Sequence, residues 1–275
     1  MMKLPLTAII LTKNEEEAIL DCIKSLDFCS QIIVVDSEST DSTVLKSRQV
    51  GATVVNFKWN KQYPKKKQWS LERTEIENDW VLFLDADERV SHDLAKEIAN
   101  NFKKSINKFA AYDVKVKYFF DGKFLRFGHK VRKRILINKN KCHFPIVDDL
   151  HVKNMWEVEG HYQPLVNGRI GMFKNYVSHY DPDPLYDYFS RHNRYSDWEA
   201  SMRISQSSRN SVRESKTLQG KLFEMLPGKP IVFFIYSYFL RLGFLDGRAG
   251  FNYSLALSFY YWQINLKYRE LKNEA

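Results

Sequence analysis

The feature that most constrains this fold is a series of short apolar runs that alternate with helical segments. Four such runs lie in the first third of the chain: LTAIIL (6–11), QIIVVD (31–36), ATVV (52–55) and WVLFL (80–84). Their length and their β-branched residues favour buried strands, and the segments after the first two runs have helical spacing or open with N-cap residues. Strands that alternate with helices predict an α/β fold with a mostly parallel sheet flanked by helices.

Polar side chains follow the ends of three of these runs. Thr12 and Asn14 come after the first run, Asp36 ends the second, and Asp85 and Asp87 follow the fourth. The carboxyl ends of parallel strands meet at one edge of a sheet, and α/β proteins bind their ligands there. We therefore expect these side chains to line one site.

Asp85 and Asp87 flank a single alanine directly after an apolar strand. Carboxylate oxygens suit Mg²⁺ or Mn²⁺, and such an ion is commonly shared with substrate phosphates. The pair is therefore predicted to hold a metal that neutralises a leaving diphosphate. Alternatively, both could be solvated turn carboxylates that cap the next helix.

Asp36 at a neighbouring strand end could accept hydrogen bonds from a ribose or a base, or it could cap the helix after it.

The motifs LTKNEE, IIVVDSESTDST and WVLFLDADERV occur in this order and resemble the nucleotide-sugar-binding half of family 2 glycosyltransferases, which have the GT-A fold. The resemblance covers residues 5–100 and implies a metal-binding pair at Asp85 and Asp87. It implies a nucleotide pocket lined by Thr12, Asn14, Glu15 and Asp36. It also puts Lys67 of the basic run 65–67 where such enzymes often contact the nucleotide; the alternative is a solvated, basic helix start.

The later part of the chain resembles, more loosely, the bacterial subgroup that adds sugars to lipopolysaccharide core or lipid-linked glycans. The similarity lies at Gly168, at His179-Tyr180 and at GFLDG (243–247). Many members of that subgroup have a Val-His-Glu triplet, whereas this chain has Glu159-Gly160-His161. The chain therefore differs from the subgroup at the position where the catalytic base is expected.

An inverting sugar transfer needs a general base that takes the proton of the acceptor hydroxyl. The candidates are Glu159, His161, Asp148 and Asp149. Asp148-Asp149 resembles the acidic pair that supplies the base in other family members, while Glu159 and His161 lie in a segment bounded by Gly and Pro. Each candidate could instead be a surface carboxylate or a hydrogen-bonded loop histidine. We favour Glu159.

A helix is predicted over residues 185–204, and it carries Arg191, Arg194 and Tyr195 on one face. Such an array could clamp a diphosphate of the donor or of a lipid acceptor. The alternative is a helix that packs on the core and leaves a solvated basic edge.

Residues 231–266 are aromatic and apolar, and only Arg241, Asp246 and Arg248 are charged. The uninterrupted apolar run falls short of the roughly 20 residues that a membrane span needs. Its Tyr- and Trp-rich continuation is typical of a membrane interface. We expect a helical, membrane-associating region at 221–275 after a catalytic domain at 1–220, whose acceptor half covers 101–220. The alternative is a helical hairpin packed on protein.

Charge and cysteine content bound the partners and the compartment. The chain has 42 Lys and Arg against 33 Asp and Glu, a net charge of +9, which suggests an anionic partner. Its three cysteines cannot all pair and lack metal-ligand spacing, which fits a reduced compartment. We therefore expect a cytoplasmic protein, peripheral or monotopic at the inner face of the cell membrane.

Taken with the resemblance, these observations predict an inverting glycosyltransferase. It would move a sugar from a nucleotide-diphosphate sugar, a UDP-sugar above all, to a lipid-linked or lipopolysaccharide acceptor, without a nucleic-acid partner. A nucleotidyltransferase of similar fold is the first alternative, but LTKNEEEAIL lacks the glycines of a phosphate loop. A basic nucleic-acid-binding protein is the second, and it would leave the acidic strand ends unexplained.

Overall fold

The computed structural model describes residues 3–73, 75–104, 106–153, 155–160, 162–181, 184–204 and 228–274. The chain divides into two compact units, each made of three segments. Unit 1 comprises Met1–Lys117, Val131–Phe144 and Pro164–Pro182, and unit 2 comprises Tyr118–Lys130, Pro145–Gln163 and Asp183–Ala275. The domain boundary that the sequence predicts near residue 220 lies outside the described residues.

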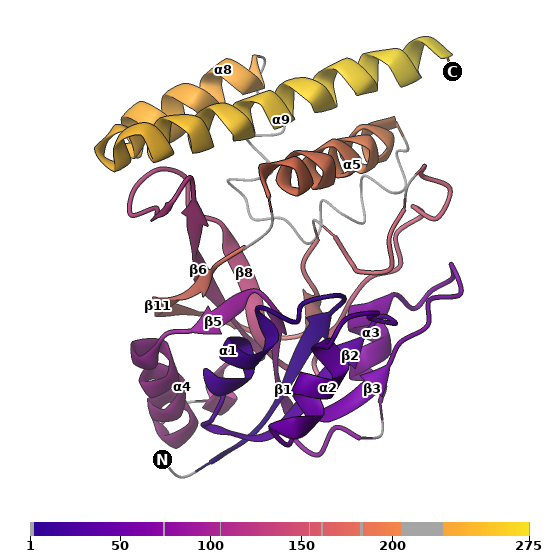
Figure 1. Cartoon of the computed structure of the whole chain (residues 1–275), viewed down its shortest axis with the longest axis vertical. Helices are drawn as coiled ribbons and strands as arrows, with labels where there is room; N and C mark the ends of the chain where they lie inside the picture. The colour runs from indigo at the N-terminus through magenta and orange to yellow at the C-terminus, as the bar shows by residue number, and fades with distance from the viewer. Residues whose placement is uncertain are drawn as a thin grey trace. The chain divides into compact units, whose positions relative to one another are not determined.

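Unit 1 is built on a mixed sheet (Figure 1). Its parallel part has the order β3-β2-β1-β4, formed by β1 (Leu4–Thr12), β2 (Cys29–Asp36), β3 (Thr53–Asn56) and β4 (Trp80–Asp85). The order then continues through β8 (Arg132–Asn138), β6 (Ala111–Phe120), β11 (Ile170–His179) and β5 (Glu88–Val90). The pairs β4–β8, β8–β6 and β11–β5 are antiparallel, so the expected α/β sheet is confirmed as parallel in its first half and antiparallel beyond.

Four helices flank this sheet (Figure 1): α1 (Ile19–Lys24), α2 (Thr43–Gln49), α3 (Lys66–Leu71) and α4 (His92–Lys104). The central strand β1 is buried at every position from Leu6 to Thr12, because helices cover both faces of a parallel sheet. This double burial explains why the strand is a continuous apolar run rather than an alternating one. The remaining short elements are η1 (Ile106–Lys108), β9 (Cys142–His143) and β10 (Leu165–Val166), and all three cysteines are buried and unpaired.

Two sequence expectations about unit 1 are wrong in their bounds. The third helix is predicted over 69–76, but α3 begins at Lys66 and ends at Leu71. The chain leaves the helix because Ile76 enters the core, where it is 5% exposed, and the carbonyl of Glu75 accepts a 2.6 Å hydrogen bond from Gln31 Nε2. Tertiary contacts therefore override the helical pattern of this segment.

Residues 142–180, assigned by the sequence to loops and short strands, contain the ten-residue strand β11. One face of β11 carries Gly171, Phe173, Asn175, Val177 and His179, so polar and glycine positions hide its alternation. Phe173 stacks on the ring of Tyr112 at 4.8 Å, and a Cβ at Gly171 would lie 2.5 Å from that same ring. The glycine therefore makes room for an aromatic side chain of the core.

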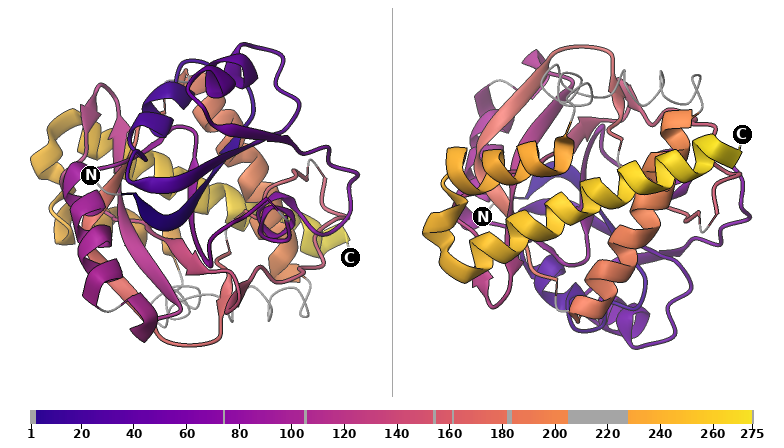
Figure 2. Two further views of the ribbon diagram at one scale, coloured as in Figure 1. Left: turned by 90° about the horizontal axis from the view of Figure 1, so that it is seen from below. Right: turned by 90° about the horizontal axis from the view of Figure 1, so that it is seen from above.

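Unit 2 is dominated by helices: α5 (Leu185–Ile204), α8 (Lys229–Phe234), η2 (Ile235–Leu240), η3 (Gly243–Asp246) and α9 (Gly247–Glu274). The predicted helix over 185–204 and the predicted helical C-terminal region are confirmed. The long helix α9 packs against both α5 and α8 (Figure 2, right). Among the described residues, no single helix is long and apolar enough to cross a membrane. One pair of helical stretches, Lys229–Leu240 and Gly243–Glu274, has the required length and composition when the two are taken together, but they are bent by 69°.

The GFLDG segment joins η2 to α9 and anchors a loop of unit 2. The carboxylate of Asp246, only 2% exposed, accepts the backbone N–H groups of Arg126 and Phe127, both at 2.8 Å. A Cβ at Gly243 would lie 2.8 Å from the carbonyl oxygen of Ser237, so only glycine fits this close approach. The motif is therefore a structural clamp between the C-terminal helices and the loop that precedes β8.

Candidate active site

The strand register places three predicted residues in one row at the carboxyl edge of the parallel strands. Thr12 of β1 pairs with Asp36 of β2, and Leu11 of β1 pairs with Asp85 of β4. Neighbouring strands lie about 4.8 Å apart, so side chains at this edge can contact one ligand. The structure thus brings Thr12, Asp36 and Asp85 together, as the sequence predicts.

The loops that follow β1 and β2 are joined by hydrogen bonds. Asn14 adopts a left-handed backbone conformation (φ 55°), its N–H donates to Ser39 Oγ at 2.8 Å, and its Oδ1 accepts the N–H of Thr40 at 2.8 Å. The N–H of Glu15 donates to Thr43 Oγ1 at 2.8 Å. Asn14 and Glu15, predicted to line the nucleotide pocket, therefore hold the two loops that shape it.

Asp36 is buried and folds the loop that follows it. Its Oδ2 accepts the N–H of Ser39 at 2.8 Å, and its Oδ1 accepts the hydroxyl of the same serine at 2.5 Å. The alternative that Asp36 caps α2 is wrong, because Asp41 bonds the N–H of Thr43 in that helix at 3.0 Å. A carboxylate oxygen can accept more than one hydrogen bond, so Asp36 retains capacity for a ligand hydroxyl.

Two hydroxyl groups at this edge are buried and make no hydrogen bond within the described residues: Thr12 Oγ1 and Ser37 Oγ. Both belong to the row of strand ends, where the N–H of Ser37 donates to the carbonyl oxygen of Thr12. An unsatisfied buried polar group costs about 1–3 kcal/mol, so such groups in a native protein call for a partner. A polar ligand at the strand ends would supply one.

The basic run 65–67 points inward. Lys65 and Lys66 are 0% and 1% exposed, and Lys66 Nζ donates to the carbonyl oxygen of Thr12 at 2.8 Å. Lys67 is half-buried, lies 5.9 Å from the ring centroid of Phe144, and its charge acts on Asp85. The alternative of a solvated basic helix start is therefore wrong for Lys65 and Lys66, and this run adds positive charge beside the strand ends.

Asp85 is paired with a lysine that the sequence did not single out. Lys133 Nζ contacts Asp85 Oδ2 and Glu88 Oε2, both at 2.6 Å, and Glu88 Oε2 also accepts the N–H of Asp85. Burial alone would raise the pKa of Asp85, but Lys133, together with Lys67, holds it well below its usual range. Asp85 is thus a fixed carboxylate with one oxygen committed to Lys133.

Asp87 lies in a different group. Its Oδ2 is 3.2 Å from Nδ1 of His179, and Asp87, His179 and Asp181 each offer one ligand atom within 4.8 Å of the others. Burial alone would lower the pKa of His179, but the carboxylate of Asp87 raises it to about 9. The structure gives Asp87, but not Asp85, a place in a metal-capable group of the described residues.

The donor atoms of this group fit a divalent cation. Asp87 Oδ1 is buried and accepts no hydrogen bond from the residues that the structure describes, so it is available to a cation. Carboxylate oxygens with one imidazole nitrogen suit Mn²⁺, and carboxylate oxygens suit Mg²⁺. The N–H of Tyr180 donates to the carbonyl oxygen of Asp87 at 2.9 Å, which fixes the two loops against each other.

The candidate bases of unit 2 differ in burial. Asp149 is 0% exposed and its Oδ2 accepts the indole N–H of Trp198 at 2.8 Å, while Glu159 is 1% exposed. Asp148 is exposed and lies 3.7 Å from Nδ1 of His151. His161 lies outside the described residues. The bond from Trp198 fixes the orientation of Asp149, and the assignment of the base stays a prediction.

Residues 7–153, more than half of the chain, match the family Glycosyl transferase family 2. This chain belongs to that family. It is therefore a glycosyltransferase, and the first of the three functions that the sequence left open is the one supported.

Curated relatives of this glycosyltransferase extend over nearly its whole length. An uncharacterised glycosyltransferase of Rickettsia typhi, RT0209, is 29% identical and covers 97% of this chain and 87% of its own. The lipopolysaccharide core biosynthesis glycosyltransferase LpsC of Rhizobium meliloti is 27% identical over 91% of this chain and 85% of its own.

Solved structures give looser matches. Staphylococcus aureus TarS (1–349) is 18% identical, covers 94% of this chain and 90% of its own, and has a TM-score of 0.44. A Mycobacterium tuberculosis glucosyl-3-phosphoglycerate synthase, solved with Mn²⁺, UDP and phosphoglyceric acid, is 25% identical with a TM-score of 0.31. That match covers 42% of this chain and 43% of the other, so the chain spans under half of that protein.

The predicted phosphate clamp of this family 2 glycosyltransferase lies on α5 of unit 2. The guanidinium of Arg194 stacks over the ring of Trp156 at 5.4 Å, and Tyr195 packs on the same indole at 5.0 Å. Arg194 Nε is buried without a hydrogen bond among the described residues. Arg191, also on α5, is half-buried. The clamp stays a prediction, with Arg194 as its best-placed donor.

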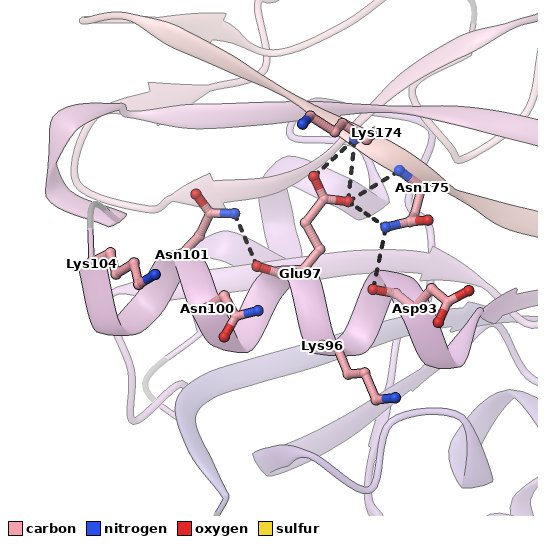
Figure 3. A pocket seen from close by; sticks show the side chains of 8 residues that line it. All are labelled: Asp93, Lys96, Glu97, Asn100, Asn101, Lys104, Lys174 and Asn175. Carbon is pink, nitrogen blue, oxygen red and sulfur yellow. Dashed lines mark hydrogen bonds between the residues drawn. The ribbon is translucent and has the colours of Figure 1, made fainter.

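A polar pocket between α4 and β11 belongs to the scaffold rather than to the strand-end site (Figure 3). The carboxylate of Glu97 accepts the N–H groups of Lys174 and Asn175 and the side-chain amide of Asn175, at 2.9 to 3.0 Å. The carboxylate of Glu97 therefore links α4 to β11, the strand that carries His179. The pocket contains none of the strand-end residues.

Sequence reasoning missed the roles of four residues: His179, Asp181, Lys133 and Lys66. The sequence marks His179 only through the family resemblance, because glycine and polar positions hide the alternation of β11. A histidine at a strand end, two residues before an aspartate, was the available signal. No local signal marks Lys133 as a partner of Asp85, because antiparallel pairing of β8 beside β4 brings them together.

Proposed function

We propose that this glycosyltransferase moves a sugar, with inversion, from a nucleotide-diphosphate sugar to a lipid-linked or lipopolysaccharide acceptor in bacterial surface polysaccharide synthesis. UDP-sugars are the proposed donors. The observation that carries the proposal is a metal-capable group (Asp87, His179, Asp181) that begins directly after β4, while the neighbouring strands β1 and β2 end at the unsatisfied hydroxyls of Thr12 and Ser37. The similarity to LpsC supports the acceptor class.

Asp87 and His179, with Asp181, would hold the divalent cation of this proposal, Mg²⁺ or Mn²⁺. When bound, such a cation supplies charge stabilisation for a leaving diphosphate. The hydroxyls of Thr12 and Ser37 are available as donors or acceptors to the nucleoside, and the carboxylate of Asp36 can accept a further hydroxyl.

Positive charge from the chain itself would assist at the diphosphate. Lys67 is half-buried, and its charge acts on Asp85. Because Lys133 already pairs with the carboxylate of Asp85, the charge of Lys67 can favour an added anion. Asp85 keeps one oxygen for a ligand hydroxyl, since its other oxygen is bound to Lys133. Asp85 would therefore orient the donor while Asp87 holds the metal.

The candidate residues for the general base and for the acceptor contacts belong to unit 2. A base must be held in a fixed orientation within reach of the acceptor hydroxyl. Asp149 meets the first condition through its bond from Trp198, and Glu159 is the base that the sequence favours. Arg194 on α5 would bind phosphate of the donor or of a lipid acceptor, since its Nε has an unused donor. Catalysis would take place at the cytosolic face of the membrane, where nucleotide sugars are available.

Nucleotide binding tests the donor half of this proposal. We expect UDP with Mn²⁺ to raise the melting temperature, because a ligand at about 100 times its Kd stabilises a protein by about 2.7 kcal/mol. ATP and an oligonucleotide are the comparison ligands, and Asp36→Ala is the variant that should weaken binding of free UDP in calorimetry. A larger shift with ATP, or with the oligonucleotide, would contradict the proposal.

Paired carboxamide variants test the base. Glu159→Gln and Asp149→Asn are each compared with Asp148→Asn, whose carboxylate is exposed. The true base should lose transfer but keep UDP binding, because a base acts only when the acceptor is deprotonated. Full activity in both buried-site variants would move the role to Asp148 or His161, which Asp148→Asn and His161→Gln test in the same assay.

A further inference from the structure

We infer that one exposed face of the C-terminal helices docks on an anionic lipid surface. This outer apolar face consists of side chains from α9 and from α8 with η2: Phe251, Leu255, Phe259, Trp262 and Leu266, and Ile231, Ile235 and Phe239. All eight are between 38% and 69% exposed. The inference adds a partner surface to the proposed function and does not depend on which sugar donor is used.

The exposed side chains of α9 form one straight stripe. With about 100° per residue, positions 251, 255, 259, 262 and 266 fall within an arc of about 80° on the helix. The buried hydrophobic side chains of α9 lie on the opposite arc: Ala249, Tyr253, Ala256, Tyr260 and Ile264. The helix is thus apolar on two opposite sides, and only one of them is covered by protein.

The preceding helical stretch adds a second stripe. Ile231, Ile235 and Phe239 recur at intervals of four residues and are 69%, 45% and 53% exposed. The helix α8 packs alongside α9 (Figure 2, right), so both stripes belong to unit 2. Large exposed apolar surfaces mark interaction sites rather than ordinary protein surface.

Charge selects the partner. Between Arg248 and Lys267, eighteen residues carry no charge. Exposed cations lie near both ends of the stripe, at Arg248, which also pairs with Asp121 at 3.2 Å, and at Arg269. Over residues 228–274 there are six Lys and Arg against three Asp and Glu, which leaves +3. One of those carboxylates, Asp246, is buried and already bonded. An apolar stripe bordered by cations matches a membrane surface with anionic headgroups.

A second copy of this chain would fit the face less well. In a two-fold dimer the same patch meets itself, so the +3 of each segment would face the other. The whole chain also carries +9, which disfavours close approach of two copies. Binding to anionic lipid would both remove the apolar side chains from water and neutralise the cations. Self-association would remove the apolar side chains from water but would not neutralise the cations.

The aromatic side chains set the mode of contact. Phe259 and Trp262 stack at 5.4 Å on the outer side of α9, and an indole prefers the headgroup boundary of a bilayer. Because the opposite side of α9 is packed on protein, the helix would lie along the membrane surface with one face in lipid. This arrangement would bring a lipid-linked acceptor to the enzyme that carries the helix.

Flotation of the full chain with vesicles tests the inference. We expect flotation with phosphatidylcholine vesicles containing phosphatidylglycerol, weaker flotation with pure phosphatidylcholine, and a decrease as salt screens the headgroups. The variant Leu255→Glu/Phe259→Glu should bind vesicles at least about a hundredfold more weakly, because each lost apolar side chain is worth roughly tenfold or more. Leu45→Glu on α2, 59% exposed in the wild type, is the matched control and should float normally.

Two further readouts decide between lipid and protein. Brominated lipid should quench the fluorescence of the wild type more than that of Trp262→Phe, which locates the stripe at the bilayer. UDP binding by all variants is measured in parallel, so that a failed donor proposal is distinguished from a failed membrane inference. Absence of flotation with anionic vesicles, equal flotation of the double variant, or a lipid-free dimer that the double variant abolishes would overturn the inference.

Discussion

Two half-buried histidines, one in each unit, have pKa values shifted in opposite directions. In unit 1, His179 lies 3.2 Å from the carboxylate of Asp87; burial alone would lower its pKa, but that carboxylate raises it to about 9. In unit 2, His129 packs near the rings of Phe233 and Tyr236, at 5.2 and 6.3 Å; burial, together with Arg241, lowers its pKa to about 4. Carboxylates decide the protonation state of the first histidine and aromatic packing decides that of the second.

The difference extends to the whole of each unit. The sheet edge of unit 1 buries Asp36, Glu88 and Lys66 with named hydrogen-bond partners, and the atoms left over point to a ligand. The C-terminal helices of unit 2 instead expose large apolar side chains, from Ile231 to Leu266. The unsatisfied polar atoms at the sheet edge of unit 1 and the exposed apolar side chains of the C-terminal helices therefore indicate two kinds of partner, a charged small molecule and a lipid surface.

The largest effect is expected from breaking the metal-capable group. Asp87→Asn should lower transfer by roughly 1,000-fold and abolish Mn²⁺ binding, because electrostatic stabilisation of the departing group is lost. Asp85→Asn should also reduce transfer but keep Mn²⁺ binding, since Asp85 is bound to Lys133. Turnover and Mn²⁺ titration are measured side by side; Mn²⁺ binding by Asp87→Asn equal to wild type, or no effect of EDTA on wild-type turnover, would contradict the assignment.

The next effect concerns the charge balance of unit 1. Lys133→Met should lower the free energy of unfolding by about 3 kcal/mol, because it leaves the carboxylates of Asp85 and Glu88 together without a cation. Lys133→Arg keeps the charge and is the matched control, with a smaller loss. Urea denaturation gives both values, and a loss for Lys133→Met no larger than for Lys133→Arg would show that the pair is dispensable.

A smaller, pH-dependent effect is expected in unit 2. The folded pKa of His129, about 4, lies below the unfolded value near 6.5, so the unfolded state binds the extra proton first. The contribution of His129 to stability is therefore complete above pH 6.5 and is lost as the pH falls toward 4, by at most about 3 kcal/mol. Unfolding of wild type and His129→Gln is compared between pH 7 and 4. The variant should lose less stability over this interval, and parallel curves would refute the assignment.

The smallest effect is expected on the outer apolar face. Phe259→Glu should change the free energy of unfolding by no more than about 0.5 kcal/mol, because a surface side chain makes few contacts that folding depends on. Ile264→Glu, which would place a charge at a fully buried position of the same helix, is the contrast and should be strongly destabilising. Thermal unfolding without lipid measures both. A comparable loss in the two variants would mean that the outer face is covered by protein.

Local sequence patterns were sufficient to predict the parallel strands, their ligand-binding edge and the helix over 185–204. The continuous apolar run 6–11 marks a strand buried on both faces, and the polar residues after it mark a ligand edge, because strand direction and sheet position follow from short-range pattern. The helix over 185–204 is likewise visible in its sequence. The family resemblance at residues 5–100 rests on these same local motifs.

Long-range pairing decided the rest. Nothing near Asp85 in the sequence predicts Lys133, and nothing near Asp87 predicts His179, since each pair is separated by many residues and joined by antiparallel strands. The sequence likewise shows that α9 is apolar but not which of its faces is covered. The sequence by itself determined the strands, the acidic strand ends and the aromatic C-terminal region. Only the tertiary structure decided that Asp85 pairs with Lys133, that Asp87 pairs with His179 and which face of α9 is exposed. The physical reason is that these contacts and this burial form only when segments far apart in the sequence pack together.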